Sequence, residues 1–207
     1  MPAGSIERTN ARREEIINAC EKLYQTMSFK DITLKEIGKE TSFSRTSIYN
    51  YFQTKEEIFL ALLKREYDSW AGQLSEAMNM TETMTDDEIA DVLAGTLNDH
   101  RQLLKILSMN HYDLEENSRM EQLTEFKVSY GNAMKTVMEL LARFRKDMDA
   151  VKQKEFIYSF FPFMFGIYPY TVVTDKQKEA MKRAGIDYKY TSLYELTYNA
   201  VRKMLMD

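Results

Sequence analysis

The stretch ITLKEIGKETSFSRTSIYNYFQTKEEIFLALL, residues 32–63, decides the fold. It contains, at Thr33 and again at Thr54, a threonine followed three residues later by a glutamate. This spacing is typical of a capping box, in which the two side chains satisfy free backbone N–H groups at the start of a helix. The stretch therefore predicts a short helix opening at Thr33 and a longer one over about 55–78, with space between them for one turn and one more short helix.

The segment between those two helices predicts the second helix of a helix-turn-helix, over Ser44–Tyr51. Ile48 and Phe52 are four residues apart and are its only inward-facing anchors. The remaining positions carry hydroxyl, amide, guanidinium and phenol groups, which can reach base edges and phosphates in a major groove. An amphipathic pattern over residues 12–28 predicts the first helix of a three-helix head.

Composition points to an all-α protein of about nine to ten helices. The chain has 207 residues, of which 44% are hydrophobic and 29% charged, as in an ordinary folded protein. Only 7 Gly and 3 Pro interrupt it, which favours long helices over a β fold with many turns. The single Cys20 has no partner for a disulfide, and the N-terminus lacks the apolar region of a secretory signal. We therefore expect a cytoplasmic protein.

The rest of the chain repeats the helical pattern. A third threonine–glutamate pair begins at Thr85, and apolar residues at helical spacing follow it. We expect either two helices or one bent helix here, with the break near Gly95 to His100. The further expectations are a loop over 110–118, a long helix over about 118–146, a helix over about 150–168 and a terminal helix over about 191–206.

The uncharged run FIYSFFPFMFGIYPYTVVT, residues 156–174, could be either a membrane span or a buried helix. Its nineteen residues would extend roughly 28 Å as a helix, close to the thickness of a bilayer core. However, it contains two prolines and three tyrosines, and lysines flank it on both sides without an orientation bias. We interpret it as a helix buried on more than one face, kinked at Pro162, and we expect no membrane segment.

Charge is distributed unevenly between the head and the rest. Residues 1–52 contain 8 Lys or Arg and 7 Asp or Glu, whereas residues 53–207 contain 20 and 25. A mildly basic head on an acidic body is compatible with a local DNA contact but does not identify one. The isoelectric point of about 5.4 argues against unspecific coating of DNA.

Residues 10–60 resemble the DNA-binding domain of TetR-type (TetR/AcrR) transcriptional regulators. The features that match are the first helix ARREEIINACEKLYQTMSFKDIT, the helix-turn-helix, and the aromatic residues and lysine that follow at the family's spacing. The resemblance implies a helix-turn-helix domain over 1–53 and a helical effector-binding and dimerisation domain over 54–207. It implies that these residues meet double-stranded DNA: Thr33, Lys35, Ser44, Arg45, Thr46, Ser47, Tyr49, Asn50, Tyr51 and Lys55.

The chain departs from the family pattern in the turn. Where relatives usually have Gly and a small aliphatic residue, it has Ser42 and Phe43, so Ser42 has to accept the geometry of the turn and we expect Phe43 to pack deeper. Thr46 stands where Gly is frequent, and the base preference of a relative therefore does not transfer.

The resemblance further implies a homodimer, formed through the last two long helices, and a small-molecule effector in a pocket between the middle helices. The near-continuous apolar surface of the 156–174 run supports a second buried face independently. The residues expected to line the effector pocket are Leu103, Leu107, Met109, His111, Tyr112, Phe126, Tyr130, Met134, Phe161, Phe165 and Tyr168. The alternative for each of them is an ordinary place in the core.

Catalysis has no support in the sequence. His100 and His111 lack the spacing of metal ligands, and Cys20 fits a core position. No phosphate loop, dinucleotide fingerprint or HExxH motif is present. We expect no catalytic residue, no metal and no cofactor.

These observations predict a dimeric repressor that is released from a palindromic operator by a small, largely apolar effector. Two alternatives stay open at this stage. One is an activator, or a regulator of the same fold that needs its ligand in order to bind DNA. The other is an all-α small-molecule-binding protein that does not bind DNA.

Overall fold

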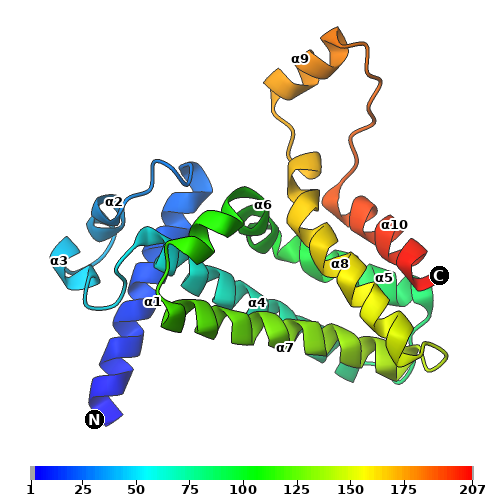
Figure 1. Cartoon of the computed structure of the whole chain (residues 1–207), viewed down its shortest axis with the longest axis horizontal. Coiled ribbons are helices and arrows are strands. Elements are labelled where there is room, and N and C mark those ends of the chain that lie inside the picture. The colour runs from blue at the N-terminus through cyan, green and yellow to red at the C-terminus, as the bar shows by residue number, and fades with distance from the viewer. Residues whose placement is uncertain (1–2, 207) are drawn as a thin grey trace. The chain divides into compact units, whose positions relative to one another are not determined.

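The computed structural model describes residues 3–206, without the side chains of residues 3–6, 45 and 109–111. Over this range the chain forms ten α-helices and no strand, which confirms the all-α prediction (Figure 1). The helices are α1 (Ala3–Thr26), α2 (Leu34–Lys39), α3 (Arg45–Ile48), α4 (Lys55–Asn79), α5 (Asp86–Asp99), α6 (Arg101–Glu116), α7 (Met120–Phe144), α8 (Ala150–Thr171), α9 (Asp175–Arg183) and α10 (Leu193–Met206).

The chain folds as two compact units. The first comprises Met1–Arg65 with His111–Val128, and the second comprises Glu66–Asn110 with Ser129–Asp207. The predicted domains, residues 1–53 and 54–207, stay a prediction.

The first unit has an aromatic core. Tyr24 and Phe29 approach Phe59 with their ring centroids 5.0 and 4.9 Å away, both edge to face. This geometry suits the ring quadrupole. Cys20 is completely buried beside them on α1, and burial raises the pKa of its thiol. Cys20 is therefore a core residue, as the sequence predicts.

All three threonines cap a helix, but of the three predicted capping boxes only that of Thr85 is complete. At Thr33 the carboxylate of Glu36 pairs with Lys39 instead of returning to the cap. Thr33 and Thr54 each accept the backbone N–H of the glutamate three residues later, and Thr85 forms the complete reciprocal box with Glu88. The carboxylate of Glu57 does not return to Thr54; it accepts the N–H of Gln53, one residue earlier, at 2.7 Å. This displacement gives Glu57 a different role, described below.

Three predicted boundaries are wrong. The first helix, expected over residues 12–28, extends from Ala3 to Thr26. The helix expected over Ser44–Tyr51 is α-helical only over Arg45–Ile48, and the chain continues as turns in which the N–H groups of Asn50 and Tyr51 bond to carbonyls three residues back. Short polar side chains such as Ser and Asn favour such turns over a longer helix. The loop expected over 110–118 is instead helical as far as Glu116, because no Gly or Pro lies between 101 and 118 to end α6.

The break expected near Gly95–His100 is confirmed as a division into two helices, α5 and α6. His100 caps the end of α5 through its backbone N–H, which bonds to the carbonyl of Thr96. Its ring nitrogen Nδ1 lies 3.2 Å from Glu66 Oε2 on α4, so this residue connects α4 to the α5–α6 junction.

The second unit is centred on Trp70. Its indole N–H donates to the hydroxyl of Thr96 at 3.0 Å, and both side chains are buried. The ring of Phe161 lies 6.1 Å away, and that of Tyr67 lies 6.4 Å away. Such a cluster satisfies the one polar atom of the indole and fills the space around it with rings.

Polar contacts attach α10 to α5. Tyr194 donates to Asp91 at 2.5 Å and Tyr198 donates to Asp87 at 2.8 Å, while the two tyrosine rings stack 5.9 Å apart. Arg202 adds an ion pair with Asp87 at 2.7 Å. The terminal helix is thus held by these contacts to the first two turns of α5.

Helix α8 contains residues 156–171 of the uncharged run and passes through both Pro162 and Pro169 without interruption. Six of its residues are buried, among them Phe156 and Phe160, yet Tyr158 is 71% exposed. Within residues 3–206 no single helix has both the length and the apolar character needed to span a membrane; α8 and α9 together meet both criteria but are bent by 85°. The kink predicted at Pro162 stays a prediction.

Candidate DNA-binding face and effector site

The helix-turn-helix is anchored by isoleucines and one phenylalanine. Ile32, Ile37, Ile48 and Phe52 have no exposed surface. The guanidinium of Arg13 lies 4.7 Å above the Phe52 ring, which covers this small core from the side of α1. The inward-facing role predicted for Ile48 and Phe52 is confirmed.

The residues predicted to meet DNA lie at the N-terminus of α2, on α3 and its N-cap, and on the turns after α3; Lys55 is the first residue of α4. Tyr49 is 45% exposed. Thr33, Lys35, Ser44, Thr46 and Asn50 are also exposed, Ser47, Tyr51 and Lys55 are half-buried, and the side chain of Arg45 lies outside the described residues. Exposed hydrogen-bonding groups thus accompany the buried anchors.

The turn before α3 closes without a left-handed residue, since no non-glycine residue between 3 and 206 has a positive φ. Glu15 on α1 accepts the backbone N–H of Ser42 and holds the turn in place. Phe43 is half-buried, its ring 6.4 Å from that of Tyr51 and 5.9 Å from the guanidinium of Arg12. Ser42 and Phe43, the two departures from the family pattern in the turn, are therefore both held by contacts with residues of α1.

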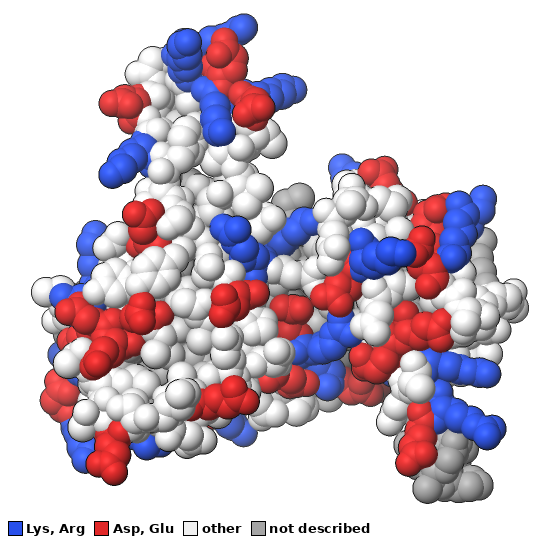
Figure 2. Space-filling model, turned by 180° about the vertical axis from the view of Figure 1, so that it is seen from behind, with Lys and Arg blue, Asp and Glu red and all other residues white. Residues whose placement is uncertain are grey.

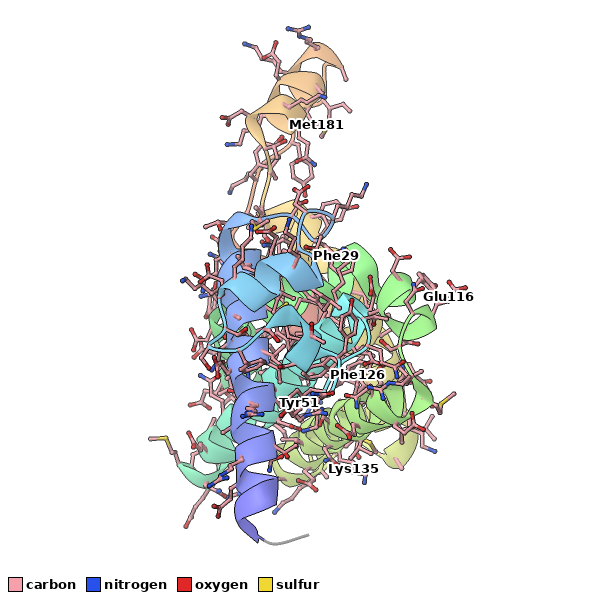
Figure 3. All side chains as sticks on the ribbon, turned by 90° about the vertical axis from the view of Figure 1, so that its left-hand side faces the viewer. Phe29, Tyr51, Glu116, Phe126, Lys135 and Met181 are labelled. Atoms are coloured by element: carbon pink, nitrogen blue, oxygen red, sulfur yellow. The ribbon has the colours of Figure 1, made fainter. Side chains whose placement is uncertain are left out.

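Two of the predicted phosphate contacts already have partners within the protein. Tyr51 lies beside α1 (Figure 3) and accepts a hydrogen bond from Arg12 at 3.3 Å. Lys55 donates to the carbonyl of Phe29 at 2.7 Å, with its ammonium 4.1 Å above the Phe29 ring. The structure thus gives Lys55 a structural role, and its contact with phosphate stays a prediction.

A buried ion pair lies behind this face and is absent from our predictions. Glu57 is completely buried, and its carboxylate accepts the Nε of Arg119 at 2.6 Å, the Nη2 at 2.9 Å and the backbone N–H at 3.1 Å. Burial alone would raise the pKa of Glu57, but the hydrogen bonds from Arg119 and Gln53 outweigh it and lower that pKa. The sequence did not reveal this ion pair because Glu57 also fits the glutamate position of a capping box that begins at Thr54.

Contacts close to this ion pair connect the helix-turn-helix to the junction between α6 and α7. Thr54 donates its hydroxyl to the carbonyl of Asn117 at 3.0 Å. Arg13 donates to Gln122 at 3.1 Å and forms an ion pair with Glu125 at 3.6 Å. Residues 111–128 therefore belong to the same compact unit as the head.

The residues predicted to line the effector pocket have mixed positions. Leu103, Leu107, Phe126 and Phe161 are buried, Tyr130, Met134, Phe165 and Tyr168 are half-buried, Tyr112 is 85% exposed, and the side chains of Met109 and His111 lie outside the described residues. Positions 111, 112 and 126 belong to the first unit and the others to the second. The predicted set thus does not fall within a single unit.

Part of that set does come together. The rings of Tyr130 and Phe161 meet edge to face at 5.5 Å, and Tyr67 lies at the same distance from Tyr130. Burial raises the pKa of Tyr67 well above its ordinary value, and the neighbouring Tyr130 adds to this. Tyr67 and Trp70 were not predicted as members of the cluster, although both lie on the apolar side of α4.

A different part of the second unit is hollow. A cavity of about 700 Å³ is lined by residues of the segment from Pro169 to Tyr190, and none of them belongs to the predicted pocket. Among the residues that the structure describes, no group of three His, Cys, Asp or Glu is arranged to hold a metal ion.

Comparisons with known proteins identify the two halves of the chain. A model of bacterial regulatory proteins of the tetR family matches residues 16–62, and a model of the tetracyclin repressor-like C-terminal domain matches residues 64–194. The helix-turn-helix and the helical remainder thus each match a model from the same group of proteins.

Curated relatives match over part of their length. The chain is 28% identical over 107 residues to the uncharacterized HTH-type transcriptional regulator YfiR of Bacillus subtilis, covering 45% of the chain and 51% of that protein. It is 30% identical over 114 residues to the HTH-type transcriptional repressor NemR of Escherichia coli, covering 52% and 57%. The chain therefore spans about half the length of the curated relatives it matches.

Among solved structures, the chain is similar to FadR of Thermus thermophilus, a TetR family transcriptional repressor in complex with lauroyl-CoA. The TM-score is 0.56 at 17% identity, with 94% of this chain and 93% of the other covered. At 17% identity, this similarity establishes that the two chains share a fold and nothing beyond it.

Proposed function

This chain belongs to the TetR family of bacterial regulatory proteins, and on that basis we propose that it is a dimeric DNA-binding transcriptional repressor whose operator binding responds to a small molecule. The relatives named above are transcriptional regulators, in agreement with the expectation that the chain is not an enzyme. A regulator of this kind acts on DNA in the bacterial cytoplasm, and we propose the same location for this protein.

The observation that carries this proposal is the polar face of the helix-turn-helix. Ile48 and Phe52 anchor α3 from inside, while Thr46, Tyr49 and Asn50 stay exposed. Hydroxyl, phenol and amide groups of this kind donate and accept hydrogen bonds at base edges and phosphates. A face that is polar, exposed and rigidly supported is suited to a major groove.

The test is binding to the DNA upstream of the protein's own gene, measured by fluorescence anisotropy over a range of salt concentrations. Thr46→Ala, Tyr49→Ala and Arg45→Ala are each expected to weaken binding by roughly 5- to 100-fold, as loss of a base or phosphate contact does. Lys135→Ala removes a charge from an exposed position of α7 in the second unit and is the control.

Operator binding that is equal for Arg45→Ala, Tyr49→Ala and Lys135→Ala would refute the assignment of this face. Absence of binding even at low salt would favour the alternative of a small-molecule-binding protein without DNA contact. Binding that appears only after a ligand is added would favour a ligand-dependent DNA binder, and increased transcription from the bound promoter would identify an activator.

We assign the dimer contact to α8 and α10. Val151, Tyr158, Pro162 and Pro169 are exposed and lie along one side of α8, since their spacings of seven, four and seven residues return to the same face of a helix. A hollow of about 190 Å³ lies between α8 and α10 and is lined in part by Phe156. It gives this surface a concave region into which a side chain of another copy could fit. Two copies that meet through the same surface would form a two-fold dimer suited to a palindromic operator.

Sedimentation equilibrium tests the dimer contact. Tyr158→Asp places a charge in the middle of the proposed surface and is expected to separate the two copies, while Tyr112→Asp, also at a strongly exposed tyrosine, is expected to leave the dimer intact. Equal dimer stability of the two variants would exclude α8 from the interface.

The proposed effector is small and largely apolar, and we place its site beside the Tyr67, Trp70, Tyr130 and Phe161 cluster. The fold relative from Thermus thermophilus was crystallised with an acyl-CoA, which makes acyl-CoA thioesters the first compounds to test. Native mass spectrometry of the purified protein, followed by thermal denaturation with lauroyl-CoA, free laurate and coenzyme A, examines this directly.

A thermal shift with the acyl compounds that Phe161→Ala abolishes would support this location. A shift that survives the substitution, with the variant folded, would place the ligand elsewhere.

A further inference from the structure

Residues 172–192, which join α8 to α10, form an arm with no core of its own. The helix α9 within it has no buried residue. Val172 and Ile186 are about half exposed, and Tyr188 and Tyr190 are each 38% exposed. In Figure 1, α9 within the arm stands away from α5, α8 and α10 of the second unit.

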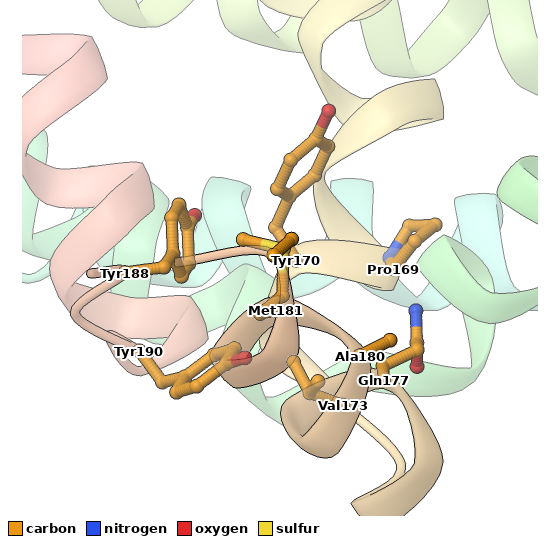
Figure 4. A pocket seen from close by; sticks show the side chains of 9 residues that line it. Pro169, Tyr170, Val173, Gln177, Ala180, Met181, Tyr188 and Tyr190 are labelled. Carbon is orange, nitrogen blue, oxygen red and sulfur yellow. The ribbon is translucent and has the colours of Figure 1, made fainter. Parts of the chain in front are cut away.

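The inner side of the arm is an apolar groove. Tyr188 and Tyr190, whose rings meet at 5.1 Å, face Tyr170 at the end of α8, with Met181 of α9 between them (Figure 4). Val173, two alanines and Pro169 complete most of the lining of this 700 Å³ space, and Gln177 is the only residue in it with a polar side chain other than the tyrosines. Gln177 Oε1 is occupied by the cap of α9, where it accepts from Thr174.

This exposure is costly for the isolated chain. A helix of nine residues is too short to be stable in water on its own, since helices below about 12–15 residues are marginal. Its apolar side needs a surface to pack against, and a contiguous exposed apolar patch commonly marks a contact with another molecule.

Two observations indicate that this molecule is a second copy of the chain. Pro169 belongs both to the groove and to the exposed side of α8 on which we place the dimer contact, so the groove continues that surface. The inference therefore rests on the proposed dimer.

The second observation is charge. Residues 172–192 contain five Lys or Arg and three Asp or Glu, whereas the rest of the chain contains 23 and 29. Figure 2 shows these charged side chains gathered around the tip of the projecting arm, with uncharged ones toward its base. A basic arm is attracted to the acidic remainder of another copy, and such complementarity fixes orientation.

We propose that each protomer's arm reaches across the dimer and packs its groove on the body of the other protomer. The apolar groove is buried by the partner, while the lysines and arginines of α9 face the partner's acidic surface. The dimer is then held by two contacts, the side of α8 and the exchanged arms.

The test uses the full-length protein with a photo-crosslinking benzoyl-phenylalanine in place of Tyr188. Copies labelled with nitrogen-15 are mixed with unlabelled copies, irradiated and analysed by mass spectrometry. We expect cross-linked peptides that combine a labelled and an unlabelled chain. Cross-links confined to one chain, or to a co-purified small molecule, would overturn the proposal.

A second measurement gives the energetic weight of the arm. The double variant Met181→Ser, Tyr188→Ser is expected to raise the dimer dissociation constant at least about tenfold, as loss of anchors in an interface does. Met120→Ser, at an exposed methionine of α7, is the matched control and is expected to stay within about twofold. Circular dichroism checks that all variants keep their helices.

The outcomes separate this inference from the proposed dimer contact. If Tyr158→Asp dissociates the protein while the arm variants leave the dissociation constant unchanged, the arm proposal is wrong and the α8 contact stands. If the wild-type protein is monomeric at all concentrations, both are wrong.

Discussion

Replacing Glu57 by glutamine tests the buried ion pair at the base of the head. The substitution keeps the size of the side chain but removes its charge and turns one acceptor oxygen into a donor nitrogen. The carboxylate accepts four hydrogen bonds, one from Gln53 and three from Arg119. Each carboxylate oxygen accepts one backbone N–H and one N–H of the Arg119 guanidinium. Whichever oxygen becomes the amide nitrogen, one hydrogen bond of each kind is lost, because a donor would then face a donor.

The size of the effect follows from these contacts. Breaking a buried ion pair by removing one partner costs about 3–5 kcal/mol. The side chain of Arg119 is 40% exposed, so water recovers part of its lost interaction. A hydrogen bond to a charged group contributes about 1.5–3 kcal/mol and a neutral one about 1 kcal/mol. We expect Glu57→Gln to lower the free energy of unfolding by about 3 kcal/mol.

Urea denaturation followed by circular dichroism at fixed protein concentration measures this change, since dimer formation makes stability concentration-dependent. Glu56→Gln makes the same chemical change one residue earlier, at a half-buried position, and is expected to cost at most about 1 kcal/mol through the helix dipole. Equal stability of the two variants would refute the structural role of the ion pair.

The pH dependence provides a second check. The pKa of Glu57 in the folded protein is lowered from the ordinary 4.5, so its contribution is complete above that value and is lost as the pH falls through the lowered pKa. The stability difference between the wild type and Glu57→Gln should therefore be constant near neutrality and shrink below pH 4.5. A difference that increases with acidification would contradict the assignment.

Three further predictions concern single residues. Thr85→Ala removes the complete capping box of α5 and should lower the free energy of unfolding by about 1 kcal/mol, whereas Thr83→Ala, just before the helix, should change it little; calorimetry compares them. Gly185 has a φ of +69°, so Gly185→Ala should destabilise the arm by about 1 kcal/mol, although no heavy atom beyond Gly185 and its two chain neighbours lies within 4 Å of the added carbon; faster amide exchange in α9 would register this. Cys20 is buried and its thiol pKa is raised, so a maleimide should label it only after denaturation, and rapid labelling of the native protein would argue against its place in the core.

Local signals in the sequence predicted the helices with strong caps and clear periodicity. Thr85 begins α5 as expected, and the periodic apolar residues placed α4, α7 and α10 within a few positions of their observed bounds. The polar residues after His111 were misread as a loop because polarity is a weaker signal than the absence of a helix breaker. The short α3 depends on competition between backbone and side-chain hydrogen bonds, which periodicity does not register.

The candidate sites were predictable only where they are local. The exposed face of α3 is contained in eight consecutive residues, and its two anchors follow from helical spacing. The pair formed by Glu57 and Arg119 joins positions 62 residues apart, and the cluster of Tyr67, Tyr130 and Phe161 brings three helices together. Such contacts depend on how helices pack, and a single sequence does not specify this through local patterns.

Trp70, the only tryptophan of the chain, provides an internal optical probe. Its indole is fully buried, donates to Thr96 and lies within 6.5 Å, centroid to centroid, of the rings of Tyr67, Phe160 and Phe161. Excited at the red edge of its absorption band, the whole protein therefore emits from one dry site. A molecule entering beside that cluster changes the polarity and quenching around the indole, so its arrival can be followed in real time, without a label, while the same sample is titrated with DNA.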